Sequence, residues 1–120
     1  MPAPVIRFEI MGGKGNQLEK FYGDLFGWKI DSNNPMKYGM VDTGTQGGIN
    51  GGVGPSQDGG KRVSVYVQVE DLDVVLAKAE KLGGKTILPP SQVPGGPNLA
   101  MFADPAGNVT GLLLGKWAGQ

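Results

Sequence analysis

Two stretches with one shared pattern decide the fold: NQLEKFYGDLFGWKI at residues 16–30 and DLDVVLAKAEKLGGKTI at residues 71–87. Each begins with a residue that can cap a helix, Asn16 or Asp71, and continues with apolar residues three and four apart. Each then reaches a helix-ending glycine and a strand that opens with lysine. The pattern predicts two copies of one module in which a helix is followed by a strand.

Alternating apolar side chains predict strands around both helices. In residues 5–11 the even positions are apolar and the odd positions include Arg7 and Glu9, so one face should be core and the other should carry both charges. Residues 62–69 alternate four valines with Ser64, Tyr66 and Gln68, and we expect the valine face to be the core. Further strands are predicted at residues 28–31, 37–42, 47–54, 85–88, 98–103 and 108–114.

Both modules therefore have the order strand, helix, strand, strand, strand. Such a half is not expected to bury its sheet alone, so the two halves should share a core in a single domain of residues 1–120. Pro89-Pro90 is expected to end the strand at 85–88, and residues 104–107 form a predicted tight turn. We place module one at residues 4–54, a linker at 55–60, module two at 61–116 and a tail at 117–120.

Composition excludes several classes of function. The 120 residues contain 11 lysines and arginines and 11 aspartates and glutamates, and this balance disfavours nucleic acid and membrane surfaces as partners. No apolar run approaches the roughly 20 residues of a membrane span. The absence of cysteine removes disulfides, thiol nucleophiles and thiolate metal sites. A cytoplasmic protein is expected.

Five segments carry a resemblance to a known family: RFEI at 7–10, FYGDLFGWKI at 21–30, VEDLD at 69–73, LGGK at 82–85 and FADPAGN at 102–108. In order and spacing they resemble the vicinal oxygen chelate superfamily, also called the glyoxalase, bleomycin-resistance and ring-cleaving dioxygenase family. The resemblance implies an α+β fold in which two βαβββ modules form a cup-shaped mixed sheet around a small ligand. It also implies a homodimer.

Enzymes of this superfamily usually hold a divalent metal on four histidine or glutamate side chains. The resemblance places those ligand positions at Arg7, around Asn50 to Gly52, at Ser64 and at Gly111. A cation, a neutral amide or glycine, a hydroxyl and a glycine do not form the donor set of a catalytic metal, and the chain has no histidine. We therefore expect no metal and no other cofactor.

Arg7 and Glu9 share one strand face and allow two interpretations. Arg7 could anchor a carboxylate, phosphate or enolate while Glu9 orients it, with Glu9 also a candidate general base. Alternatively, the two form an internal ion pair that closes the pocket, and such pairs often contribute little net stability. The residues alone leave both open.

The remaining candidate ligand contacts are aromatic, sulfur-containing or neutral polar side chains on predicted strands, because small-molecule sites are mostly apolar with a few polar groups. They are Trp28, Tyr38, Met40, Asn50, Ser64, Tyr66, Gln68 and Met101.

Three hypotheses about function follow. The first is a metal-free protein that binds an aromatic or amphipathic small molecule, similar to the bleomycin-resistance members. The second is a lyase, isomerase or dioxygenase-type enzyme of the superfamily that acts without the usual metal site. The third is a regulatory or interaction module whose cup is filled by its own side chains.

Overall fold

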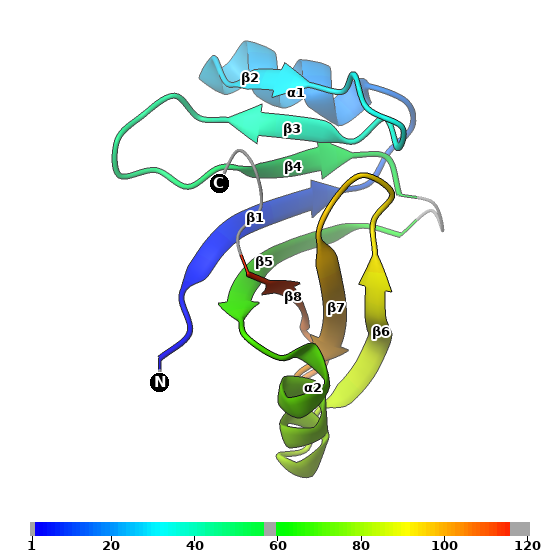
Figure 1. Ribbon diagram of the computed structural model, residues 1–120. Coiled ribbons are helices and arrows are strands. Elements are labelled where there is room, and N and C mark those ends of the chain that lie inside the picture. The colour runs from blue at the N-terminus through cyan, green and yellow to red at the C-terminus, as the bar shows by residue number, and fades with distance from the viewer. Residues whose placement is uncertain (1, 57–59, 116–120) are drawn as a thin grey trace. The chain divides into compact units, whose positions relative to one another are not determined.

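The computed structural model describes residues 2–56 and 60–115, which form two compact units. One unit comprises residues 7–56 and 60–63, and the other comprises residues 2–6 together with 64–115. The division falls inside the two strands that open the modules. Figure 1 shows the βαβββ order twice, which confirms the α+β class and the repeated module. The elements are β1 (Val5–Met11), α1 (Gln17–Phe26), β2 (Lys29–Asp31), β3 (Gly39–Asp42) and β4 (Gly51–Gly54), then β5 (Arg62–Val69), α2 (Leu72–Lys81), β6 (Lys85–Gln92), β7 (Asn98–Ala103) and β8 (Val109–Leu114).

The two units pair their strands in the same way. The order is β2-β3-β4-β1 in the first and β5-β8-β7-β6 in the second. The opening strand runs parallel to the last strand of its module, β1 with β4 and β5 with β8, and the other pairs are antiparallel. Glu9 is registered with Gly52, and Tyr66 is registered with Gly111. These two pairs therefore occupy equivalent places in the two modules.

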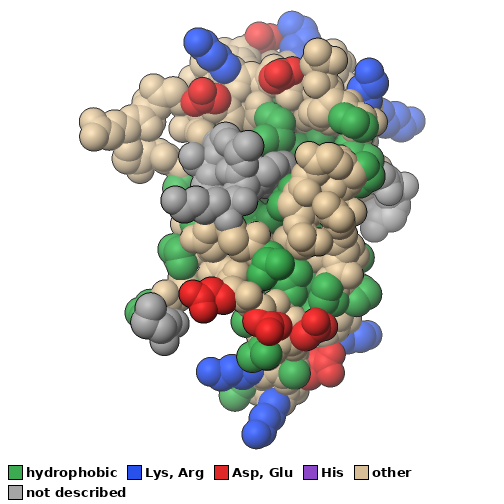
Figure 2. Space-filling view, viewed as in Figure 1, with side chains coloured by type: hydrophobic (Ala, Val, Ile, Leu, Met, Phe, Trp, Pro, Cys, Tyr) green, Lys and Arg blue, Asp and Glu red, His purple; other side chains and the backbone are tan. Residues whose placement is uncertain are grey.

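The surface carries charges of both signs. Figure 2 shows lysine and arginine side chains interspersed with acidic ones on the visible face, in keeping with the balanced composition. Within the described ranges, no helix has the length and apolar character needed to cross a membrane.

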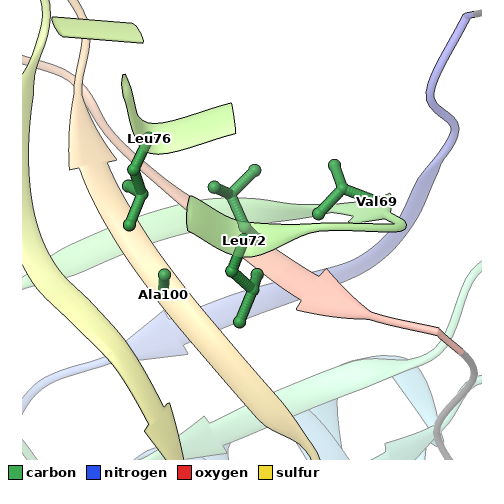
Figure 3. Packing of buried hydrophobic residues seen from close by; sticks show 5 residues of the cluster. Val69, Leu72, Leu76 and Ala100 are labelled. Carbon is green, nitrogen blue, oxygen red and sulfur yellow. The ribbon is translucent and has the colours of Figure 1, made fainter. Parts of the chain in front are cut away.

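The helix side of the second unit holds an aliphatic core. Val69, Leu72, Leu76, Ala100 and Leu112 are buried together there, and Figure 3 shows four of these side chains converging from β5, α2 and β7. The α2 helix begins as predicted, because the Asp71 carboxylate accepts a hydrogen bond from the Val74 amide at 3.0 Å.

The prediction that all four valines of β5 face the core is wrong. Val63 and Val65 are 78% and 40% exposed, whereas Ser64 and Tyr66 on the opposite face are buried. Val67 and Val69 do contact the α2 core. The valine face of β5 is therefore packed against core only towards the end of the strand.

The first unit is packed more loosely around its helix. Asn16 makes no side-chain cap to α1, contrary to the sequence expectation, whereas Gly27 ends the helix in the left-handed conformation as predicted. The helix lies against β2 and β4, yet none of its residues is buried. An aromatic group fills the space between helix and sheet, with the rings of Tyr22, Phe26 and Phe8 all packed on that of Trp28.

Several strand boundaries differ from the sequence expectations. The β6 strand continues through Pro89-Pro90 to Gln92, because it pairs on one side only, with β7, and register shifts accommodate the two residues that lack an amide donor. Strand β3 starts at Gly39, after Lys37 with its φ of 54°, and β4 starts at Gly51. Half of the predicted linker, residues 57–59, and the tail at 117–120 lie outside the described residues.

The predicted turn after β7 is built around one carboxylate. Asp104 accepts hydrogen bonds from the amides of Ala106 and Asn108 and from the Asn108 side chain, all at 2.9 Å. The Asn108 side-chain bond is the main cause that lowers the pKa of Asp104 below its usual value of 3.8. This capping role explains why an aspartate stands at position 104 in the FADPAGN segment.

Candidate ligand-binding site

A buried polar cluster lies on β1 in the first unit. The side chains of Arg7 and Glu9 are on the same face of the strand, as predicted, but both are buried, at 1% and 5% exposure. The Arg7 guanidinium donates a hydrogen bond of 2.7 Å to the backbone carbonyl of Gly51 on β4. The sheet itself therefore holds Arg7. Breaking this bond would leave a buried guanidinium or a buried carbonyl without its partner, at a cost in folding stability.

The Glu9 carboxylate joins two segments distant in sequence. Its Oε2 accepts a hydrogen bond of 3.0 Å from the Tyr38 hydroxyl, and its Oε1 is ion-paired and hydrogen-bonded with the Arg62 guanidinium. The Glu9 side chain is 7% exposed, whereas that of Arg62 is 34% exposed. The cluster therefore connects a buried carboxylate to a partly exposed guanidinium.

Sequence reasoning missed Arg62. The sequence indicates Arg62 only by its place as the first residue of the strand that carries Ser64 and Tyr66. A spacing of two residues in a strand puts these side chains on one face. Nothing in the sequence pairs it with a residue 53 positions earlier.

Tyr38 is held in place by its own loop. The Asn34 side chain accepts a hydrogen bond from the Tyr38 amide at 2.9 Å and donates one to the Tyr38 carbonyl at 2.6 Å. This turn directs the ring across Gly52 on β4. A Cβ atom at Gly52 would lie 1.7 Å from the Tyr38 hydroxyl oxygen and 1.9 Å from Cζ, so a side chain at this position would require the ring to move.

The second unit repeats this arrangement. A Cβ atom at Gly111 would lie 2.2 Å from Cε1 of Tyr66, so the Tyr66 ring covers that glycine. Tyr66 is buried with Met101 and Leu113 on the sheet face opposite α2. In both modules, therefore, a tyrosine ring occupies the space above a glycine of the last strand.

Two other candidate contacts of the second unit have local partners. The Ser64 hydroxyl donates a hydrogen bond of 2.9 Å to the carbonyl of Val109, and the Gln68 side-chain amide donates one of 2.8 Å to the carbonyl of Gly115. Both side chains thus contribute to the pairing of β5 with β8. Their contact with a ligand stays a prediction.

Met40 and Asn50 line an open pocket in the first unit, together with Ile30, Asp31 and Asp42. Its volume is about 320 Å³, at the low end for small-molecule sites. The Asn50 side-chain oxygen accepts a hydrogen bond of 3.1 Å from the Thr43 amide, which orients the amide group. Trp28, by contrast, packs on Phe8 in the helix-side aromatic group, apart from this polar face.

The four positions where the resemblance places metal ligands do not fit a metal here. Arg7 is a buried cation bound to a backbone carbonyl, and the Ser64 hydroxyl donates to another. In the range Asn50 to Gly52, the Asn50 side-chain oxygen accepts from the Thr43 amide, and Gly52, like Gly111, has no side chain and is covered by a tyrosine ring. Among residues 2–56 and 60–115 no group of three acidic, histidine or cysteine side chains is placed to hold a metal ion.

Comparison with known proteins agrees with the family resemblance found in the sequence. A family model described as "Glyoxalase-like domain" matches residues 14–113. The chain is 29% identical over 101 residues to the protein named "Putative glyoxylase CFP32" of Mycobacterium bovis, a match that covers 78% of this chain and 39% of that protein. The chain therefore spans about two fifths of the length of this curated relative, and a protein of the same name from Mycobacterium tuberculosis matches equally.

Solved structures share the fold at low identity. A glyoxalase/bleomycin resistance protein/dioxygenase superfamily member from Vibrio splendidus is 14% identical, with a TM-score of 0.62 over 95% of this chain and 100% of that one. Methylmalonyl-CoA epimerase from Mycobacterium tuberculosis is 12% identical, with a TM-score of 0.65 over 93% and 87%. At this identity the likeness shows the fold alone.

Proposed function

The chain belongs to the glyoxalase-like domain family, and from that premise we propose that it binds a small molecule without the divalent metal usual in that superfamily. The observation that carries this proposal is the pair of tyrosine rings over Gly52 and Gly111. At these glycines a metal-binding side chain would need the space that each ring takes. With no cysteine and a balanced charge, we place this binding in the cytoplasm.

We propose an aromatic or amphipathic ligand that meets the polar face of the first module. The half-buried side chains of Tyr38, Met40 and Asn50 supply a ring, a thioether and an oriented amide, in or directly before the neighbouring strands β3 and β4. The Arg62 guanidinium, which is ion-paired with Glu9, adds a partly exposed cation to the polar cluster on β1. A polarizable thioether and an aromatic ring adapt to flat apolar groups, and the amide and the guanidinium suit a polar end.

Metal content tests the proposal directly. Protein purified without a chelator should contain well under one equivalent of zinc, nickel, manganese or iron by elemental analysis, because the four usual positions offer no donor set. Its melting temperature should be the same with and without EDTA. A stoichiometric metal, or a melting temperature that falls on chelation, would overturn the metal-free assignment.

An enzyme remains the second candidate, and one observation favours it. The Glu9 carboxylate is buried and hydrogen-bonded to a phenol, which is an environment in which a general base can be positioned. Methylmalonyl-CoA, the substrate named for the epimerase neighbours, is a suitable probe for proton removal next to a carbonyl. Solvent deuterium entering this thioester with the wild-type chain and with the control Glu70→Gln, but not with Glu9→Gln, would establish catalysis.

The third hypothesis, a cup filled by its own side chains, has support in the second unit. Tyr66, Met101 and Leu113 are buried together on the sheet face where the resemblance implies ligand contact. A panel of aromatic carboxylates, amines and phenols should separate the possibilities through melting-temperature shifts. We expect at least one compound to raise the melting temperature of the wild-type chain and to lose this effect in Met40→Ala. No shift with any compound would favour the filled module.

A further inference from the structure

The second unit has a groove at the start of α2. It is lined by residues 2–4, by the end of β5 with the start of α2, and by the end of β8, and all of these segments belong to this unit. Its volume is about 950 Å³, at the upper end for small-molecule sites. Val69 and Val75 line the groove and also belong to the α2 core, so the groove reaches the helix side of the sheet, whereas Tyr66 is buried on the opposite face.

Gln68 connects the three segments that line the groove. Its backbone amide donates a hydrogen bond of 2.9 Å to the Pro4 carbonyl, and its side-chain amide donates one of 2.8 Å to the Gly115 carbonyl. The Gly115 amide in turn donates one of 3.3 Å to the Val69 carbonyl. Because these polar groups already have partners, the groove is held in shape without a ligand, and a ligand would meet mainly its other side chains.

The ionisable side chains that line the groove are acidic. They are Glu70 and Asp71, and among the described residues no lysine or arginine lines it. One carboxylate oxygen of Asp71 caps α2 through the Val74 amide, and Glu70 is exposed. Lys78, in the last turn of α2, lies roughly 10 Å along the helix from Asp71. That distance exceeds the screening length of about 8 Å at physiological salt, so the lysine does little to offset the carboxylates.

The helix itself opposes this negative charge only weakly. The beginning of an α-helix carries about half a positive charge, whereas the two carboxylates bring two negative charges. Asp73 adds a third acidic residue in the first turn, and Figure 2 shows acidic side chains close together around the start of α2. The local field therefore favours a cation, although the formal net charge of the chain is zero.

The rest of the lining is largely aliphatic. Pro4, Val69, Val74, Val75 and Leu114 contribute hydrocarbon surface, and Val74 is 62% exposed. Among the described residues no aromatic ring lines the groove, so it does not resemble the aromatic cages that hold quaternary ammonium groups. A cation that binds here would instead meet carboxylate oxygens, which favours a group with N–H donors.

We propose that this groove binds a small molecule in which one ammonium or guanidinium group is attached to an aliphatic body. The cation lies against the carboxylates of Glu70 and Asp71, and the hydrocarbon part packs on Val74 and Leu114. This ligand differs in charge and in its contacts from the aromatic or amphipathic ligand proposed for the first module. The chain would therefore have a second binding site, on the α2 side of its second unit.

Three probes with the same hydrocarbon chain test the ligand class: hexylammonium, hexanol and hexanoate. In NMR titrations of the ¹⁵N-labelled chain, hexylammonium should shift the amide signals of Val69, Glu70 and Val75 in a saturable way. Hexanol should bind about threefold more weakly, because it lacks the ion pair, and hexanoate should bind more weakly still. No saturable shift at these amides, or hexanoate binding as tightly as hexylammonium, would overturn the proposal.

Variants test the groove itself. Glu70→Gln should weaken hexylammonium binding about threefold and leave hexanol binding unchanged, because it removes the charge and keeps the shape of the side chain. The matched control is Glu80→Gln, near the end of the same helix and outside the groove, which should leave both affinities unchanged. Val74→Thr should weaken hexylammonium and hexanol alike, because it makes the hydrocarbon wall polar. Circular dichroism checks that each variant is folded.

Equal effects of Glu70→Gln and Glu80→Gln on hexylammonium binding would contradict the assignment of the cation to this groove. Met40→Ala, which should abolish binding of the aromatic ligand in the first module, should bind hexylammonium as the wild-type chain does. The failure of either site is therefore seen separately from that of the other.

Discussion

Replacing Arg7 with alanine is expected to lower the free energy of unfolding by about 3 kcal/mol. Arg7 is 1% exposed and its guanidinium donates to the Gly51 carbonyl at 2.7 Å, so its removal takes a donor from a buried carbonyl and leaves a cavity beside β4. Urea denaturation, with the midpoint and slope fitted together, measures the change.

The control for this prediction is Lys20→Ala. Lys20 is also a cation in an ion pair, but both side chains of that pair are more than two-thirds exposed, and we expect a loss of no more than about 0.5 kcal/mol. If Arg7→Ala costs less than about 1 kcal/mol, the sheet does not depend on Arg7, and its role as an anchor for an anionic ligand gains support.

Whether Arg7 also couples to Glu9 is a separate question that a double-mutant cycle answers. Arg7→Met, Glu9→Gln and the double variant would be compared by the same urea measurement. A coupling free energy above about 1 kcal/mol would establish the internal ion pair of the second interpretation. Additive effects would leave Arg62 as the ion-pair partner of Glu9 that matters for stability.

The second large effect is expected at Gly111. Gly111→Ala should destabilise the chain by about 2 to 3 kcal/mol, because the new methyl group would lie 2.2 Å from the buried ring of Tyr66. Tyr66→Ala alone should cost about 3 to 5 kcal/mol by opening a cavity. The double variant should be no less stable than Tyr66→Ala, since the methyl group then has room. Fully additive losses would contradict the packing of this ring on Gly111.

The equivalent pair in the first module should respond more weakly. Gly52→Ala is expected to cost about 1 to 2 kcal/mol, because Tyr38 is only half-buried and can move aside, although it then loses its bond to Glu9. Gly54→Ala is the control on the same strand. The nearest atom to its new Cβ is Met11 Cε at 3.8 Å, an ordinary contact, so we expect a change within about 0.5 kcal/mol.

Local pattern was sufficient for most of the secondary structure. The alternation in residues 5–11 and 62–69 predicted β1 and β5 with their observed bounds, and the Asp71 cap and the Gly27 terminus lie where expected. The errors arose where burial depends on a neighbour. The valines of β5 look like core by pattern, but only Val67 and Val69, near the end of the strand, pack with the α2 core.

The candidate site was only partly predictable for the same reason. Arg7, Glu9 and Tyr38 were identified from residue type and strand position, and the structure brings Tyr38 to Glu9. Arg62 was not identified, because its contact with Glu9 joins two strands that are separated by most of the first module. Alternation gives the face of a side chain but not the distant residue that it meets.

By itself, the sequence determined the doubled βαβββ module, since local periodicity and helix-ending glycines are properties of short segments. It also showed that histidine and cysteine ligands are absent, since no folding can supply residues that the chain does not contain. Only the tertiary structure decided what occupies the positions where the resemblance places metal ligands. Tyr38 reaches across Gly52 and Tyr66 across Gly111 because strand pairing places a ring and a glycine together, and contacts between strands are set by the whole sheet.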